Sequence, residues 1–361
     1  MRQEENEMKT IRRHYKVLML CLFVLLTCSA CSNPRGTDGK TKVDQIIASE
    51  KIEISKSQVN IEEVSDPDLK EKLTSESGDT VTIEPTTWAS AWHNGWFDGL
   101  IVWPIAQLIN VLASFTDAGW GIILTTLLIQ LLIYLLTYKS QLSQQRMQEL
   151  QPEMQRIQNK YAGKNDERSR MLMAQETQKL YTENDIHPFG SILVMFIQLP
   201  VMMGMFYATM RAATTVYGSF MGMPLSETPL GAFANLDWGP IIVYALMIIM
   251  SIVSMQLPKW MNKMDQKKKE SASKSKFKKQ EEKPQGGMMA NTMNMTMYMT
   301  TAMVAFMYIS WPIAMSFYWL VSSVIRSGMS VISHFVSNKK AEAKAAAAPA
   351  YDSGILKNRK K

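Results

Sequence analysis

The chain has 361 residues and a formal net charge of +7, with 39 Lys and Arg against 32 Asp and Glu. Its mean hydropathy of -0.09 would fit a soluble protein, but the apolar residues are concentrated in blocks over 119–137, 190–210, 239–257 and 292–333. Because a bilayer core about 30 Å thick requires roughly 20 apolar residues per helix, this pattern excludes a purely soluble chain. The cysteines all lie within residues 21–31, which excludes a disulfide framework.

The first 30 residues have the parts of an export signal. An apolar run over 17–27 follows a basic stretch and leads through two small residues to Cys31. The pattern resembles a bacterial lipobox, with Cys28 at the position where Leu is usual. It predicts a lipoprotein signal peptide over 1–30 and attachment of lipid, such as palmitate, at Cys31. An uncleaved signal anchor is the alternative.

Residues 31–87 are predicted to form a disordered extracytoplasmic tether without a functional site. From 33 to 86 the segment is rich in Lys, Glu, Asp, Ser and Thr and has no aromatic residue, so it has too little apolar surface to fold alone. Residues 88–118 instead mix tryptophans with apolar residues at helical spacing. They predict an amphipathic helix at the outer membrane interface, where tryptophan is enriched. A sixth span is the alternative.

Five transmembrane helices are predicted, over 119–138, 189–211, 239–257, 291–310 and 312–333. Pro258 is expected to end the third, and a tight turn at 310–312 separates the last two. The loop 258–290 is rich in lysine and the tail 334–361 ends in basic residues, whereas the loop 212–238 has no Lys or Arg. The positive-inside rule places 139–188, 258–290 and 334–361 in the cytoplasm and 212–238 outside. The N-terminus is then outside and the C-terminus inside.

The segment 139–188 is predicted to form a cytoplasmic helical hairpin. Its first half carries apolar residues at alternating steps of three and four, which is a helix-packing seam, formed by Met147, Leu150, Met154, Ile157 and Tyr161. Pro152 is expected to kink this arm, and Asn165 or Asp166 to cap the second. A loop of this length with its own structure indicates a partner-binding or regulatory element. A plain connector is the alternative.

Several short motifs resemble the YidC/Oxa/Alb membrane protein insertase family, in its Gram-positive lipoprotein form. They are MQELQPEM at 147–154, QNKY at 158–161, KLY at 179–181, IQLPV at 197–201 and FYW at 317–319. The resemblance covers about 96–335 and implies an all-α bundle of five transmembrane helices around a hydrophilic groove open to the cytoplasm. It implies a chaperone-like insertase that is not an enzyme and needs no cofactor. Nascent membrane proteins would be its substrates.

The resemblance also suggests which residues line the groove. The family usually has an arginine in the middle of its first span, where this chain has Gln130. Arg326 in the last span is a candidate replacement for that charge, and a side chain that reaches to the cytoplasmic interface is the alternative. The remaining predicted groove residues are polar or match the family's aromatic pair: Thr126, Gln198, Gln256, Tyr318 and Trp319. Thr125 adds a hydroxyl, and buried amides also act as plain interhelical contacts.

Other partners and other functions follow from the same features. The basic loop and tail would either bind ribosomes or serve only to fix topology. The Sec translocon would either be a partner or be dispensable. Membrane lipids would surround the spans. A small-molecule or ion transporter is the main alternative function, although the predicted spans contain no Asp, Glu or Lys. A membrane enzyme lacks a recognisable motif here, and a structural scaffold leaves the polar residues within the spans unexplained. The methionine-rich fourth span fits ordinary packing or a pliable substrate surface.

Overall fold

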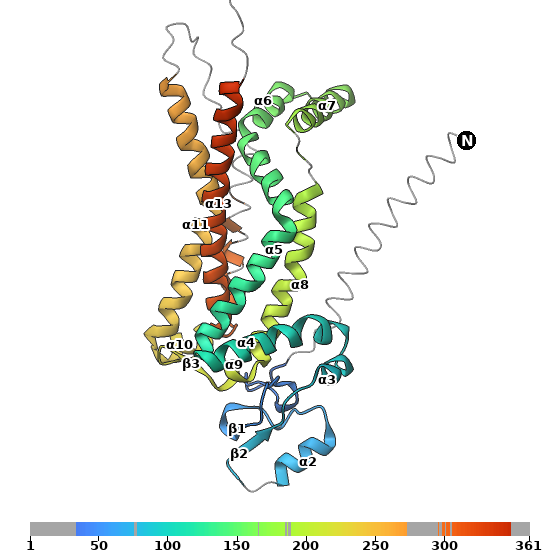
Figure 1. Ribbon diagram of the computed structural model, residues 1–361, viewed down its shortest axis with the longest axis vertical. Coiled ribbons are helices and arrows are strands. Elements are labelled where there is room, and N and C mark those ends of the chain that lie inside the picture. The colour runs from blue at the N-terminus through green and yellow to red at the C-terminus, as the bar shows by residue number, and fades with distance from the viewer. Residues whose placement is uncertain are drawn as a thin grey trace, which may run out of the picture. The chain divides into compact units, whose positions relative to one another are not determined.

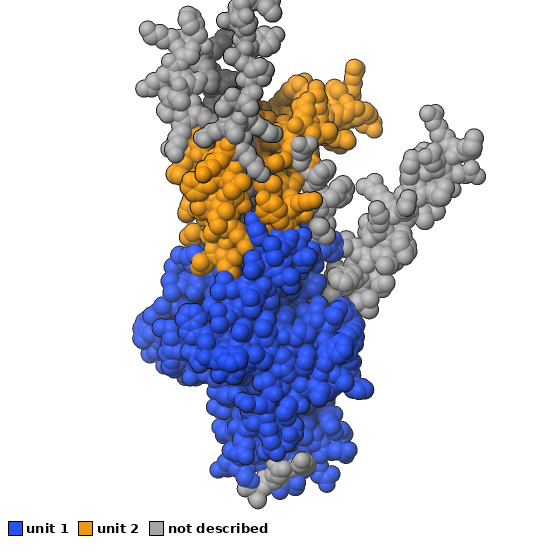
Figure 2. All heavy atoms as spheres, in the orientation of Figure 1, with its two compact units in different colours: residues 1–136, 193–251, 297–322 blue, residues 137–192, 252–296, 323–361 orange. Residues whose placement is uncertain are grey.

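The computed structural model describes residues 34–75, 78–164, 166–184, 186, 189–272, 295, 298–299, 301–303 and 305–347. The predicted signal peptide, Cys31, most of the basic loop, much of the predicted fourth span and the last residues of the tail lie outside these ranges. The chain divides into two compact units (Figure 2), and each is described by itself. Unit 1 comprises 1–136, 193–251 and 297–322, and unit 2 comprises 137–192, 252–296 and 323–361.

Unit 1 begins with a small folded module, here the N-terminal module, over residues 34–86 (Figure 1). It contains η1 (Val43–Gln45), β1 (Ile52–Ser55), η2 (Lys56–Gln58), α2 (Pro67–Ser75) and β2 (Thr80–Ile83). The two strands are antiparallel, with Ile54 opposite Val81. The prediction of a disordered tether over 31–87 is therefore wrong for the described residues.

The core of the N-terminal module explains why composition alone predicted disorder. Ile54 and Val81 are almost completely buried, and they share a cluster with Ala213 and Val216 of α9 (Ala213–Tyr217). A segment with so few apolar residues cannot form a sufficient core by itself. It folds here because a distant part of the chain completes its core.

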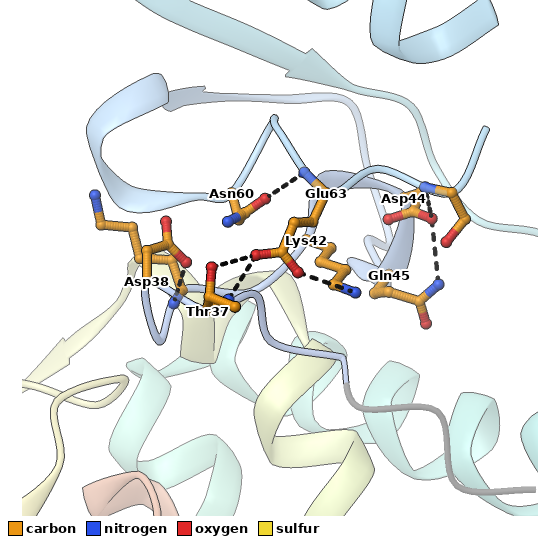
Figure 3. A network of polar contacts seen from close by, with 9 residues as sticks. Thr37, Asp38, Lys42, Asp44, Gln45, Asn60 and Glu63 are labelled. Carbon is orange, nitrogen blue, oxygen red and sulfur yellow. Dashed lines mark hydrogen bonds and ion pairs between the residues drawn. The ribbon is translucent and has the colours of Figure 1, made fainter. Parts of the chain in front are cut away.

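A polar network orders the loops of this module (Figure 3). The carboxylate of Glu63 accepts hydrogen bonds from the backbone N–H of Thr37 at 2.7 Å and from its hydroxyl at 2.5 Å. Lys42 lies 3.7 Å from the same carboxylate, and Asn60 accepts a bond from the Glu63 backbone N–H. Because hydrogen bonds from Thr37 stabilise the charged form, with Lys42 adding to the effect, the pKa of Glu63 is lowered.

The module also caps α8 (Phe189–Arg211). The last carbonyls of a helix have no intrahelical partner. Here the Thr41 hydroxyl donates to the carbonyl of Met210 at 2.9 Å, and the Ile47 backbone N–H donates to the carbonyl of Arg211 at 2.7 Å. The Ile47 carbonyl in turn accepts from Ala213 at 2.9 Å. The N-terminal module is thus part of the fold of unit 1 rather than a free linker.

The segment predicted as one interfacial helix forms α3 (Trp88–His93), the π-helical turn η3 (Asp98–Val102) and α4 (Trp103–Phe115). Three side chains on α4 donate to the module's backbone or its edge: Trp103 to Thr86, Gln107 to Ala48 and Asn110 to Ile47. By length and composition, three helices among the described residues could cross a membrane, namely Asp98–Phe115, Ala118–Gln144 and Trp238–Asp265.

Three described helices extend beyond the spans predicted for them, whereas α8 matches its predicted span. The three longer helices are α5 (Ala118–Glu149), α11 (Trp238–Ala272) and α13 (Ile313–Ala347). Pro258 was predicted to end the third span, but it lies inside α11. The segment between α8 and α11 contains α9, the short strands β3 (Ser219–Phe220) and β4 (Met223–Pro224), and α10 (Pro229–Asn235).

Unit 2 contains α6 (Gln151–Tyr161) and α7 (Glu167–Glu183), in the segment predicted as a helical hairpin. α5 ends at Glu149 and α6 begins at Gln151, so the helix is interrupted at Leu150. Pro152 lies in the first turn of α6, where its missing N–H removes no hydrogen bond. Asp166 caps α7 by accepting from the Ser169 backbone N–H. The two arms meet where Glu176 accepts from Lys160 and Tyr161.

Candidate functional site

The polar residues predicted in the first span lie on one face of α5. Thr125, Thr126 and Gln130 are buried, whereas a stripe of leucines on the same helix is exposed. The exposed members are Leu127, Leu128, Leu131, Leu132, Leu135 and Leu136. This separation of polar from apolar side chains has the period of a helix. The polar face of α5 therefore points into unit 1, and the leucine face is the one that lipid can contact.

Gln130 makes the principal interhelical contact of this face. Its Nε2 donates to Oγ of Ser322 on α13, at 3.2 Å between the two heavy atoms. Both side chains are buried, with Ser322 fully enclosed. Thr126 is satisfied within its own helix, since its hydroxyl donates to the carbonyl of Ile122. Gln130 is thus a neutral hydrogen-bond donor that joins α5 to α13.

Two other buried polar atoms, one on α5 and one on α8, have unused hydrogen-bonding capacity. Thr125 Oγ1 and Gln198 Nε2 are buried, and neither has a hydrogen-bond partner among the described residues. A buried polar atom without a partner costs roughly 1–3 kcal/mol. Each such atom calls for an explanation, and a role in contacting a polar substrate segment is one of those that fit.

The aromatic pair predicted for the site lies on α13 and contributes packing. Tyr318 is fully buried in the main apolar cluster of unit 1, and Trp319 packs against its edge. The Trp319 ring lies 5.6 Å from that of Tyr318 and 5.2 Å from that of Tyr308, centroid to centroid. The pair therefore fixes the helix that presents Ser322.

The remaining two predicted site residues belong to unit 2. Gln256 is half-buried on α11. Arg326 is half-buried on α13, and its Nη2 donates to Oγ of Ser323 at 2.9 Å, within one turn of the same helix. Tyr318, Ser322 and Arg326 follow one another at intervals of four residues along α13, so they start from the same helix face.

Sequence reasoning missed the main charged contact of unit 1. The guanidinium of Arg211, at the end of α8, lies 2.5 Å from the carboxylate of Asp98 in η3, and its Nε donates to the Gln45 carbonyl at 2.7 Å. The Arg211 side chain is only 5% exposed. The available signal was an arginine at the very end of an apolar span and an aspartate in an aromatic-rich segment, but nothing in the sequence pairs the two.

This arrangement offers hydrogen-bonding groups that can bind and position a polar segment. Among the described residues, no group of three or more His, Cys, Asp or Glu side chains could hold a metal ion. What the site offers is hydroxyl and amide groups inside an apolar bundle. Fold and site together define a polytopic helical membrane protein with polar groups buried within its spans.

The comparisons with known proteins place this chain in a particular family. The profile of the 60Kd inner membrane protein family matches residues 110–343, which is more than half of the chain. The chain belongs to this family. The match begins within α4 and ends within α13, so it includes the helices that carry Gln130, Gln198 and Ser322.

Several relatives share the printed name membrane protein insertase YidC. The one from Enterococcus faecalis is 28% identical over 238 residues, which cover 66% of this chain and 74% of the relative. A Listeria monocytogenes relative is 28% identical over 280 residues, covering 76% of this chain and 83% of its own length. One from Streptococcus pyogenes is 31% identical over 134 residues, covering 37% of this chain and 48% of the relative.

Proposed function

We propose that this protein inserts other proteins into the cell membrane and assists their folding there. The observation that carries the proposal is the buried polar face of α5, joined to α13 by the bond between Gln130 and Ser322, in a chain that belongs to a family whose named relatives are insertases. The transporter alternative is not favoured by these relatives.

The mechanism follows from the energetics of polar groups in lipid. A charged side chain at the bilayer centre costs about 2.5–3.5 kcal/mol on insertion scales. Hydroxyl and amide groups within the bundle lower this barrier for a polar substrate segment by replacing part of its hydration. Burial of the substrate's apolar segment then drives the process, at about 0.8 kcal/mol per methylene group. No covalent step is needed.

The groove proposed for this chain differs from the usual one in its charge. Gln130 supplies hydrogen bonds without attracting an acidic substrate end. We assign the attraction of acidic ends to Arg326, because it follows Ser322 by one turn on α13 and so starts from the same face of that helix. Gln198, whose Nε2 has no partner among the described residues, is a second candidate for direct contact with substrate.

The proposed topology follows the distribution of charge. Lipid attached at Cys31 anchors the N-terminus outside, the hairpin of α6 and α7 lies in the cytoplasm, and α4 lies at the outer interface. The last assignment is supported by the bonds of Trp103, Gln107 and Asn110 to the polar N-terminal module, since a helix bonded along its length to polar backbone has that face away from lipid. The Sec translocon and the ribosome, through the basic loop and tail, are proposed partners.

The test is insertion of a small single-span protein into liposomes, with and without the purified protein, measured as protection of the substrate from added protease. We expect protection that depends on the protein. If folded protein gives no protection, insertion by this chain alone is refuted. An ion-flux assay on the same liposomes addresses the transporter alternative, and protein-dependent flux without protection would favour it.

Substrates with acidic and with neutral translocated ends then test the charge assignment. We expect Arg326→Ala to lower insertion of the acidic substrate more than that of the neutral one. Arg146→Ala, in the last turn of α5, is the matched control that removes an arginine elsewhere in unit 2. Equal losses for both substrates would refute the role of Arg326 while leaving insertion itself intact.

A further inference from the structure

The segment between α8 and α11 carries large apolar side chains that unit 1 does not bury. We call these side chains the outer apolar patch, and they are Met221, Leu230, Phe233, Leu236 and Trp238. Met221 is 80% exposed and Leu236 is 71% exposed. Contiguous exposed apolar side chains mark a surface that contacts another apolar phase or partner.

The backbone holds this patch outward. The Leu230 backbone N–H donates to the Ile309 carbonyl at 2.9 Å, and that of Ile313 donates to the Glu227 carbonyl at 2.7 Å. Thr228 caps α10, and Ala232 on its inner face is completely buried. Leu230 and Phe233 therefore cannot turn inward by a rotation of the helix without breaking these bonds.

Backbone strain points to the same two side chains. Met221 and Leu236 are the non-glycine residues with positive φ in the described part of the chain, at 52° and 57°. This conformation costs a non-glycine residue roughly 1–2 kcal/mol, and glycine or asparagine usually takes the position after a helix that Leu236 takes after α10. At Leu236 this conformation ends α10 and lets the Asp237 backbone N–H donate to the Ala232 carbonyl at 2.9 Å, and at Met221 it forms the turn between β3 and β4. The backbone thus fixes both residues at exposed turn positions, from which their side chains cannot withdraw into unit 1.

The patch adjoins an exposed apolar stripe on α11. α11 contains one of the candidate spans, and its exposed residues Trp238, Ile242, Leu246 and Ile249 follow helical spacing along one face. α10 and the β3–β4 turn lie next to the start of α11 in the chain (Figure 1). Trp238 thus belongs both to the outer apolar patch and to the exposed stripe of α11.

The charge of the loop agrees with a lipid environment. Residues 212–238 contain no Lys or Arg, and their acidic residues are Glu227 and Asp237. Glu227 is half-buried, and Asp237 is exposed between Leu236 and Trp238 in the chain, so its carboxylate has to lie on the aqueous side of the patch. Electrostatic attraction to anionic headgroups is therefore absent, and apolar burial has to supply the binding free energy.

We propose that the outer apolar patch inserts into the headgroup–acyl boundary of the membrane leaflet on the 212–238 side. Its occupant is phospholipid acyl chain, and α10 with the β3–β4 turn acts as a second interfacial segment beside α4. The loop 212–238 is then a lipid-contacting element and not only an aqueous connection. This inference goes beyond insertion and does not depend on it.

The test measures depth in liposomes that contain the full-length protein alone. An environment-sensitive fluorophore is attached to Met221→Cys and, separately, to Leu236→Cys, with the parent protein labelled in parallel as the blank. The quenchers are a phospholipid spin-labelled near the glycerol end of its acyl chain and aqueous iodide. Ile249→Cys on the exposed stripe of α11 is the lipid control, and Glu62→Cys, exposed on the N-terminal module, is the water control.

We expect both patch positions to be quenched by the spin-labelled lipid at least as strongly as Ile249→Cys, which lies about three turns into α11, and to be quenched by iodide severalfold less than Glu62→Cys. Quenching by iodide equal to that of the water control at either position would overturn the proposal. Circular dichroism of each labelled variant establishes that the helices are retained. The readout does not involve insertion of a substrate, so its result is separate from that of the proposed function.

Discussion

Two buried polar contacts join distant parts of unit 1, and they differ in charge. Arg211 and Asp98 form an ion pair between the end of α8 and η3, with the Gln45 carbonyl as a further acceptor. Gln130 and Ser322 form a neutral hydrogen bond between α5 and α13. The first contact lies next to the polar N-terminal module, and the second lies within apolar helices.

The difference shows how a membrane chain distributes its polar groups. A buried charge is tolerated where a full set of partners is fixed around it, and removal of one partner is then severe. A neutral donor within a span costs less free energy to bury, and loss of its hydrogen bond destabilises the fold less. Such a donor can therefore exchange partners. We therefore interpret the ion pair as structural and the Gln130–Ser322 bond as part of a surface that works with a substrate.

Removal of one member of the ion pair should have the largest effect. We expect Arg211→Met to lower the free energy of unfolding by about 3–5 kcal/mol, because it leaves the Asp98 carboxylate buried without its counter-charge. Chemical unfolding in detergent micelles measures the change. The double variant Arg211→Met with Asp98→Leu should recover much of the loss. Losses in the double variant equal to the sum of the two single losses would show that the two residues do not interact.

A substitution in the core of the N-terminal module should have the second largest effect. Ile54 is 1% exposed in β1, and we expect Ile54→Ala to destabilise the module by about 2–4 kcal/mol through lost burial and the cavity left behind. The measurement is cleavage within 34–86 by a protease added outside liposomes. Glu53→Ala, at an exposed position of the same strand, is the control. Equal cleavage of the two variants would mean that the module has no cooperative core.

A smaller effect is expected at the neutral contact. Ser322→Ala removes the acceptor for Gln130, and interhelical hydrogen bonds in membranes contribute about 0.6 kcal/mol on average. A double-mutant cycle with Gln130→Leu isolates the interaction. Ser327→Ala, which removes a bond within α13 to the Ser323 carbonyl, is the matched control. A coupling as large as that of the ion pair would remove the contrast between the two contacts.

The smallest effect is a dependence of the module on pH. Hydrogen bonds from Thr37 lower the pKa of Glu63 in the folded state, so its stabilising contribution is present above the unfolded pKa of about 4.3. That contribution is lost as the pH falls through the lowered folded value. We expect protease resistance of 34–86 to fall less steeply with acid in Glu63→Gln than in the parent. Glu62→Gln, at an exposed neighbour, should behave like the parent.

The parts of the fold that sequence predicted well depend on local pattern. The bounds predicted for the second span, 189–211, coincide with those of α8, because a run of apolar residues ends there at Arg211. Asp166 was one of two predicted caps for α7, and the short side chain accepts from Ser169 as such caps do. In both places the determining residues are within a few positions of each other.

The parts that sequence missed depend on partners far apart in the chain. The N-terminal module has little apolar surface of its own, and its core is completed by Ala213 and Val216. The contact of Gln130 with Ser322 spans 192 residues, so the amide could be predicted as polar but its partner could not. Pro258 was expected to end a helix, but it lies inside α11, because a proline in a long helix can be accommodated by a kink as well as by a break.

The attachment of Ile47 to the end of α8 has a consequence for the order of synthesis. The Gln45 carbonyl and the Arg211 side chain that bonds to it are separated by 166 residues. At a translation rate of roughly 5–20 residues per second, the first segment waits about ten to thirty seconds for its partner. During that interval the core of the N-terminal module lacks Ala213 and Val216, so the module cannot complete its fold until α9 has been made.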